Sequence, residues 1–341
     1  AQRSMRDLTI DSKSCGGAAA TEEKMREIMS VLGGLKGEEL GICECHELLM
    51  VRKGEGYYIN PDLCMDDVEK SAAEAESYRR AGGRTLIDAQ PVGCCRMENG
   101  LCEIAERSGV HILASTGFHT RVFYPRGHWL FQKTERELQS IFEAEIFQGM
   151  YIDCDGQFSG KQTKARAGIV KLALESTDSF RAEKALFTAA VSAAVHGERS
   201  LLVHTEPESP VTEFLAFAEK LGMEPGRIAL CHMDRTKAER AVHLEALAWG
   251  AYLEYDTIGR FKYHDNEREA EQIEEILDKG FGGRLLLSLD TTAARMKAYN
   301  KEAIGLDYIL TEFIPFMEKR GMGRSVILKM LTDNSRRYLE A

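Results

Sequence analysis

The chain contains 341 residues, which is enough to bury a large core in one domain, and a second full domain is not required. Its 54 acidic residues against 44 lysines and arginines give a formal net charge of -10, which disfavours nucleic acid as a partner because phosphate groups bind basic surfaces. No apolar stretch approaches the roughly 18 residues that span a bilayer, and no apolar signal core opens the sequence, so we expect a cytoplasmic protein without a membrane partner. The nine cysteines lack a framework spacing and are expected to be reduced thiols.

Strand and helix signals alternate along the chain after a small, polar, glycine-containing segment. Residues 1–25 are interpreted as an N-terminal extension and residues 26–341 as the folded domain. Short apolar runs predict strands at residues 41–47, 84–89, 110–115, 167–173, 200–204, 227–231, 251–255 and 284–289. Capping residues and glycine stops predict helices at residues 66–81, 99–107, 134–149, 181–196, 209–221, 236–249 with a Thr236/Glu239 capping box, 267–279, 307–319 and 324–340.

This alternation predicts an α/β fold, namely a single (β/α)8 TIM barrel with an N-terminal extension. Parallel strands need crossover helices, and the crossovers are right-handed, so one closed barrel is the simplest arrangement. A typical barrel of roughly 250 residues leaves room here for long loops. An open doubly wound sheet is the alternative, but the sequence has no glycine-rich phosphate-binding loop after the first strand.

Polar side chains stand at the ends of five predicted strands. His46, Lys171, His204, His232 and Asp290 end the first, fourth, fifth, sixth and eighth. A barrel brings such residues together at its C-terminal mouth, where imidazole and carboxylate groups suit zinc, manganese or iron. A single histidine in such a place is more often a hydrogen-bonded core residue, but three histidines and an aspartate at equivalent positions favour a metal site.

Lys171 lies inside the apolar run 167–174, where an ammonium group is costly unless it is paired or loses its proton. A neutral amine can add carbon dioxide, and the resulting carbamate has two oxygens that can bridge two divalent ions. The alternatives are an ion pair with Asp290 or a side chain that extends out of the barrel.

Several short motifs follow one another along the chain. They are Gly41-Ile-Cys-Glu-Cys-His46-Glu-Leu48, Ala167-Gly-Ile-Val-Lys171, Val203-His204-Thr205, His232-Met-Asp234, Gly250-Ala-Tyr-Leu-Glu-Tyr-Asp256-Thr-Ile-Gly259, Leu287-Ser-Leu-Asp290 and Asp333-Asn-Ser-Arg-Arg-Tyr-Leu339. Each motif alone is weak, but their ordered succession over about residues 26–341 is specific. The chain resembles the phosphotriesterase family of the amidohydrolase superfamily, and more closely its phosphotriesterase-homology branch.

The resemblance implies a divalent metal cofactor of one or two ions, with zinc as the first candidate. Carried over residue by residue, it assigns His46 and Asp290 to a first, more buried ion and His204 and His232 to a second ion. It assigns Lys171, as a carbamate, to the bridge between them.

Leu48 departs from the family pattern, in which a second histidine follows the first by two residues. Leucine cannot bind a metal, so the first site is expected to lose a ligand and the second to be the stronger one. Alternation along the strand puts Glu44, His46 and Leu48 on the inward face, while Cys43, Cys45 and Glu47 face the helices. The cysteines are therefore poor substitutes, and Glu44 would lie about 7 Å deeper along the strand.

The resemblance implies hydrolysis of a small-molecule lactone, carboxylic ester or phosphoester, with a lactone or ester favoured. A metal-bound hydroxide attacks the substrate, Asp290 accepts or shuttles the proton, and Lys171 takes part as the bridge. The family tendency also implies a homodimer. The alternative is a catalytically weakened barrel that acts as a small-molecule binding or regulatory protein, although the retained metal-type cluster argues against it.

Loops after the strands are expected to supply the substrate pocket. The segment after the third strand is rich in aromatic and cationic residues, which suits a partly apolar, oxygen-rich ligand. Cations after the seventh and eighth strands suit an anionic substituent. The alternatives are a rim loop packed on its own aromatics and solvated surface charges. The candidate substrate-binding residues are His119, Tyr124, His128, Arg260, Lys262 and Arg295.

Overall fold

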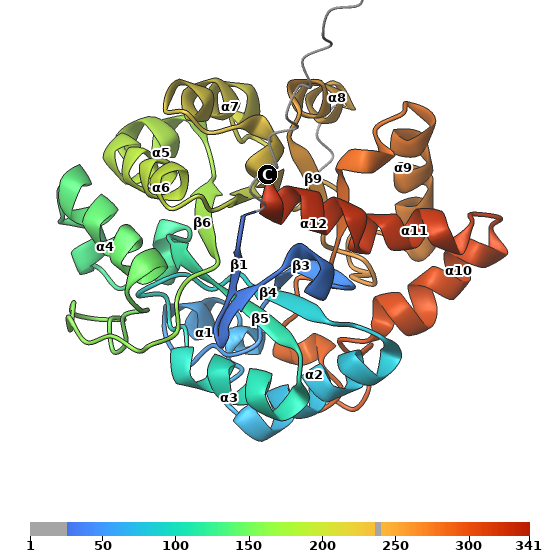
Figure 1. The fold of residues 1–341 in the computed structure, drawn as a ribbon, viewed down its shortest axis with the longest axis horizontal. Coiled ribbons are helices and arrows are strands. Elements are labelled where there is room, and N and C mark those ends of the chain that lie inside the picture. The colour runs from blue at the N-terminus through green and yellow to red at the C-terminus, as the bar shows by residue number, and fades with distance from the viewer. Residues whose placement is uncertain (1–25, 236–239) are drawn as a thin grey trace, which may run out of the picture.

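Eight parallel strands surround the centre of the computed structural model, which describes residues 26–235 and 240–341 (Figure 1). Their apolar side chains are buried on both faces of the sheet, as expected where helices cover the outside. In sheet order they are β3 (Cys43–Glu47), β4 (Thr85–Asp88), β5 (His111–Gly117), β6 (Ile169–Leu174), β7 (Leu201–Thr205), β8 (Ile228–Leu230), β9 (Tyr252–Tyr255) and β10 (Leu285–Leu287).

The sheet closes on itself between β3 and the segment that follows β10. Ser288 Oγ accepts a hydrogen bond from His46 N at 3.0 Å, and Asp290 N donates to His46 O at 3.0 Å. The buried Glu47 carboxylate accepts a hydrogen bond from Leu289 N at 2.8 Å. The strands therefore form a nearly closed barrel, and the predicted (β/α)8 architecture is confirmed.

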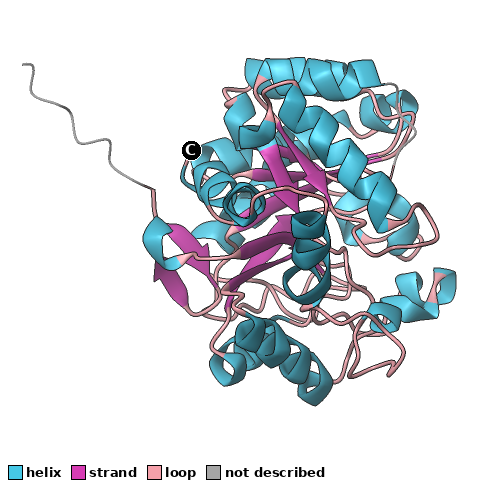
Figure 2. Cartoon of the chain, turned by 90° about the vertical axis from the view of Figure 1, so that its right-hand side faces the viewer, coloured by secondary structure: helices cyan, strands magenta, loops and turns pink. Residues whose placement is uncertain are grey.

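Helices cover the outside of the strands (Figure 2). They are α1 (Glu55–Ile59), α2 (Val68–Ala81), α3 (Glu98–Ser108), α4 (Glu135–Phe147), α5 (Thr177–Ala182), α6 (Lys184–His196), α7 (Val211–Lys220), α8 (Arg240–Trp249), α9 (Asn266–Asp278), α10 (Ile314–Lys319), α11 (Arg324–Leu331) and α12 (Asp333–Glu340). A π-helical segment, η8 (Ile309–Phe313), leads into α10. Among these described helices, none combines the length and apolar character that crossing a bilayer requires.

The sequence-based helices differ from the structure by one omission and three divisions. The short helix α1 was not predicted, and the helix predicted at residues 307–319 consists of η8 and α10. The helix predicted at residues 181–196 consists of α5 and α6, because Ser176 caps an earlier start and the helix breaks at Glu183. The helix predicted at residues 324–340 divides into α11 and α12 at Thr332. The predicted extension 1–25 and the Thr236/Glu239 capping box lie outside the described residues.

The N-terminal face of the barrel is covered by segments from both ends of the described chain. A hairpin that sequence patterning missed, β1 (Ile28–Ser30) with β2 (Gly33–Leu35), lies against the starts of β5 and β6, where Val31 N donates to Ile112 O. Helix α12 covers the start of β7, since Tyr338 Oη donates to Leu201 O at 2.7 Å. Figure 1 shows both segments crossing in front of the strands. The opposite, C-terminal face is left as the mouth.

Candidate metal centre

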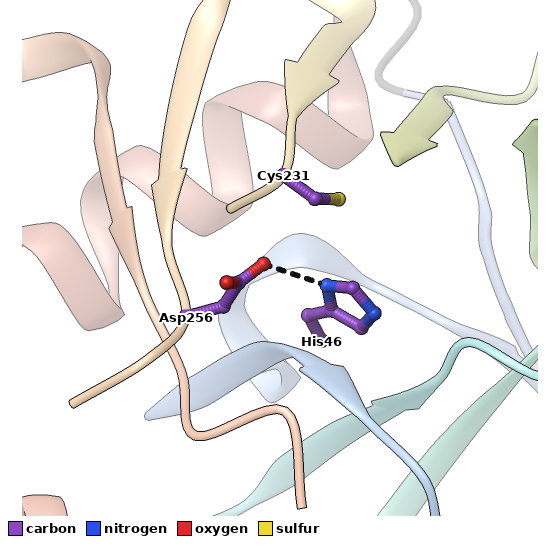
Figure 3. A group of neighbouring side chains, drawn as sticks. All are labelled: His46, Cys231 and Asp256. Carbon is purple, nitrogen blue, oxygen red and sulfur yellow. Dashed lines mark hydrogen bonds and ion pairs between the residues drawn. The ribbon is translucent and has the colours of Figure 1, made fainter. Parts of the chain in front are cut away.

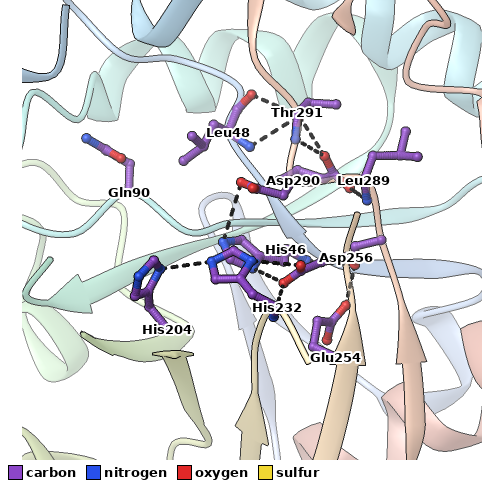
Figure 4. Close-up of polar contacts among 12 residues, drawn as sticks. His46, Leu48, Gln90, His204, His232, Glu254, Asp256, Leu289, Asp290 and Thr291 are labelled. Carbon is purple, nitrogen blue, oxygen red and sulfur yellow. Dashed lines mark hydrogen bonds and ion pairs between the residues drawn. The ribbon is translucent and has the colours of Figure 1, made fainter. Parts of the chain in front are cut away.

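The side chains predicted to bind metal meet at the C-terminal ends of the strands (Figure 4). His46, Lys171, His204 and His232 are all buried, whereas the Asp290 side chain keeps 13% of its surface exposed. His232 and Asp290 adopt left-handed backbone conformations, with φ of 62° and 49°. Such conformations are costly for residues with a Cβ atom and occur at functional sites. The turns after β8 and β10 thus carry backbone strain where they bring these two side chains to the mouth.

Nitrogen atoms of four basic side chains face one another in two close pairs. Lys171 Nζ lies 3.1 Å from His46 Nε2, and His232 Nε2 lies 2.8 Å from His204 Nδ1. Burial lowers the pKa of His204, and it lowers the pKa of His232 to about 3, so both imidazoles are neutral near pH 7. A divalent ion could bind the nitrogen lone pairs that face one another in these pairs. This donor set therefore fits a divalent metal ion.

Asp256 forms hydrogen bonds with two of these imidazoles, those of His46 and His232. Its Oδ2 accepts from His46 Nδ1 at 2.8 Å, and its Oδ1 accepts from His232 Nδ1 at 2.7 Å. Burial acts to raise the pKa of Asp256, but the two imidazoles outweigh it and hold that pKa well below its ordinary value. With Nδ1 of each ring committed as a donor, the Nε2 lone pairs of both rings are free for a metal. Asp256 follows a predicted strand directly, so its position in the sequence carried the same signal as the predicted ligands.

A smaller group of possible ligands lies beside these residues and consists of His46, Cys231 and Asp256 (Figure 3). One ligand atom from each lies within 4.8 Å of the others. The contact between His46 and Asp256 occupies Nδ1, however, and burial raises the pKa of the Cys231 thiol well above its ordinary value. Asp256 is thus already paired with His46, and a protonated thiol makes Cys231 a poor ligand.

Asp290 lies between a guanidinium group and an imidazole. Arg260 Nη2 is 3.0 Å from Asp290 Oδ2, and His46 Nε2 is 3.9 Å from Asp290 Oδ1. Burial acts to raise the pKa of Asp290, but Arg260 and His46 outweigh it and lower that pKa, so the carboxyl group is ionised at neutral pH. Arg260, predicted to bind substrate, is thus found as the ion-pair partner of Asp290.

Comparison with known proteins places this arrangement in a family. A sequence model of the phosphotriesterase family matches residues 26–339. The chain belongs to the phosphotriesterase family. It is 29% identical over 328 residues to the phospho-furanose lactonase of Mycoplasmopsis agalactiae, a match that covers 93% of this chain and 92% of that protein. It is 26% identical to the Escherichia coli phosphotriesterase homology protein, over 84% of this chain and 93% of that one. The crystal structure of an amidohydrolase from Mycoplasma synoviae superposes with a TM-score of 0.85 at 26% identity, covering 93% of this chain and 92% of that chain.

Leu48 gives this phosphotriesterase-family centre its apolar side. Its side chain lines a small cavity together with Gln90, His119 and Phe123. The His119 ring lies 5.5 Å from the His204 ring, so the cavity lies beside the centre. Glu44, the deeper inward residue of β3, is fully buried, and burial raises the pKa of its carboxyl group well above the ordinary value.

The structure distributes the other predicted substrate residues over the surrounding loops. Tyr124 is buried, and its hydroxyl accepts a hydrogen bond from His119 N at 2.9 Å. His128 is buried with its Nε2 3.2 Å from Cys154 O. Lys262 is exposed, and its Nζ lies 4.8 Å from the centre of the Tyr263 ring.

Arg295 is buried beneath the loop that follows β9. Its guanidinium donates to Ile258 O at 2.7 Å and to Gly259 O at 3.1 Å. These bonds hold residues 258–259 in place. They therefore help to position Arg260, the ion-pair partner of Asp290.

Proposed function

We propose that this chain is a metal-dependent hydrolase of lactones and carboxylic esters, with phosphoesters as secondary substrates. The observation that carries the proposal is the convergence of His204, His232 and Lys171, with an ionised Asp290, at the mouth of the barrel, beside a cavity lined by Leu48 and His119. Membership of the phosphotriesterase family and similarity to a phospho-furanose lactonase support it.

His204, His232 and Lys171 would hold a divalent ion, zinc first among the candidates, and His46 and Asp290 border the same space. Such an ion would make water acidic enough to act as a nucleophile near neutral pH and would polarise the oxygen under attack. We further propose that Lys171 is carbamylated when the centre is loaded, since its amine is buried beside His46 without a carboxylate partner among the described residues.

The surrounding residues supply the remaining chemistry. Asp290 is ionised and oriented by Arg260, so it can accept the proton of the attacking water. Asp256 holds two imidazoles in the ligand tautomer, and Leu48 presents an apolar side chain beside His46.

The substrate is proposed to combine an apolar or ring portion with an anionic substituent. Leu48 and Phe123 offer apolar contact, while Gln90 and His119 offer polar groups to a lactone ring. Phosphorylated furanose lactones are therefore the first substrates to test, because the M. agalactiae relative is named for acting on that class.

The experiment is a hydrolysis assay of the zinc- or manganese-loaded protein on phosphorylated and plain lactones, carboxylic esters and a phosphotriester. Turnover is expected with lactones and to vanish in the His204→Ala/His232→Ala variant. Asp290→Asn is expected to lower turnover by roughly 10²-fold with metal retained, the scale of general acid–base effects. An Asp290→Asn enzyme with parental turnover would remove this residue from the reaction.

A binding or regulatory role is the second candidate, favoured by Leu48 at the position where the family pattern expects a ligand. It predicts that the loaded protein binds a lactone in calorimetry yet turns over none of the panel. That result would reject the hydrolase proposal.

A further inference from the structure

A second cluster of ligand-type side chains lies beside the mouth, formed by Asp234, His264 and Glu269. Asp234 follows β8, His264 ends the loop after β9, and Glu269 lies near the start of α9. One ligand atom from each lies within 4.8 Å of the others. Asp234 and Glu269 are buried, and the His264 side chain is 10% exposed. None of the three belongs to the centre described above.

Glu269 is the feature that requires an explanation. Its side chain is 1% exposed, yet neither carboxylate oxygen makes a hydrogen bond. His264 Nε2 lies 3.2 Å from Oε2 but without hydrogen-bond geometry, and the Asp234 carboxyl group faces the same space. Buried carboxylates are almost always hydrogen-bonded, paired or bound to a metal, so two unfilled oxygens aimed into a cluster point to a missing ligand.

Asp234 adds a second carboxylate to the cluster, and no lysine or arginine of the described residues neutralises it. Its Oδ2 accepts from Thr257 N and Thr257 Oγ1, each at 2.7 Å, and that hydroxyl oxygen lies 3.4 Å from His264 Nε2. Within residues 26–235 and 240–341, no lysine or arginine forms an ion pair with Asp234 or Glu269. The neighbouring Arg235 and Arg268 pair with Glu206 and Glu271 instead.

We propose that Asp234, His264 and Glu269 hold a divalent transition-metal cation that is separate from the ion at the barrel mouth. Two carboxylates and one imidazole form a donor set that suits Zn²⁺ or Mn²⁺ better than the all-oxygen shells of Ca²⁺ or Mg²⁺. The cation compensates both buried carboxylates and occupies the unfilled oxygens of Glu269.

The cation ties the end of β8 to the start of α9. The loop between β9 and α9, residues 256–265, carries Arg260, whose guanidinium orients Asp290. A metal bridge from His264 and Glu269 to Asp234 therefore fixes both ends of that loop. Its role is to position the loop rather than to take part in the reaction.

The test counts ions in a protein that lacks the first centre. The His204→Ala/His232→Ala variant is dialysed against excess Zn²⁺, freed of loose metal and analysed by plasma mass spectrometry. One ion per chain is expected, and adding Glu269→Gln is expected to remove it. Glu271→Gln, which changes an exposed residue of the same helix, serves as the matched control and should leave the ion bound.

Folding of each variant is checked by circular dichroism, and His264→Gln replaces Glu269→Gln if the latter does not fold. Zn²⁺ should raise the Tm of the double variant and slow proteolysis within residues 256–265, and it should do neither once Glu269 or His264 is changed. A double variant that binds no ion, or that keeps its ion after both changes, overturns the proposal. Because the first centre is absent from every variant, this outcome says nothing about hydrolysis.

Discussion

Asp256 determines which nitrogen of each neighbouring imidazole can bind metal. Because it accepts from Nδ1 of both His46 and His232, Asp256→Asn leaves one acceptor for two donors and presents an amide N–H to one ring. The Zn²⁺ affinity of the centre is expected to fall by about 10–100-fold, the usual effect of removing such a partner. Competition with a chromophoric chelator measures this, with the exposed Asp278→Asn as control. Equal affinities in the two variants would contradict the assigned role.

Leu48 offers a test of the missing ligand, because it lies two residues after His46 and its side chain lines a small cavity beside the centre. Leu48→His is expected to raise the metal content by up to one ion per chain, with His46 and Asp290 already 3.9 Å apart nearby. The ion must compete with Arg260 for Asp290, so the gain should be larger in a Leu48→His/Arg260→Gln protein. Leu48→Met is the control for volume. An unchanged ion count in both histidine variants would show that Leu48 does not occupy the lost ligand position.

At the level of single residues, the sequence predicted where the polar side chains would meet but not how they pair. His46, Lys171, His204, His232 and Asp290 were recognisable because each lies at or near the end of a predicted strand, and parallel strands bring their ends together. The pairing of Arg260 with Asp290 depends on the path of a loop, which no local pattern specifies.

The hairpin of β1 and β2 packs closely against the barrel at Gly168. A Cβ atom on Gly168 would lie 2.1 Å from the carbonyl oxygen of Met29, so only glycine allows the hairpin to seat there. Gly168→Ala is expected to destabilise the protein by about 1–3 kcal/mol, measured by urea unfolding, since the backbone of the hairpin must shift. Gly156→Ala is the matched control, because nothing lies within 4 Å of its Cβ position. Equal losses in both variants would show that the hairpin does not depend on this close approach.

At the level of elements, the barrel strands could be predicted and the hairpin could not. Each barrel strand is an apolar run bounded by turn residues, and helices with clear capping signals separate them. The hairpin strands are only three residues long and flank Gly33-Gly34, so they present no periodicity to detect. Their structure comes from contacts with β5, which lies far away in the sequence.

The stability of the whole molecule is expected to depend on pH through Asp88. Burial raises the pKa of this residue to about 6, despite hydrogen bonds from Leu49 N and Gln90 N that lower it. The folded protein therefore holds this proton more tightly than the unfolded chain, whose aspartate pKa is about 3.9. Stability from this group grows as pH falls through 6 and is lost as pH rises.

Asp88→Asn removes this dependence without changing the size of the side chain. Between pH 7 and pH 5 the parent should gain about 1 kcal/mol of unfolding free energy over the variant, compared by urea unfolding at both values. Parallel pH curves for the two proteins would mean that Asp88 titrates normally.

The two ends of the described chain lie together on the face opposite the mouth. Their position determines how the protein can be immobilised without blocking the mouth. The guanidinium of Arg26 donates to the carbonyl of Ala341, and α12 lies across the starts of the strands rather than their ends. A tether at residue 341 therefore holds the barrel with its entrance pointing away from the support. Immobilised on a bead through that residue, the protein should admit large ligands as readily as it does in solution. The same attachment made through the loops of the mouth, for example at the exposed Lys262, should obstruct them.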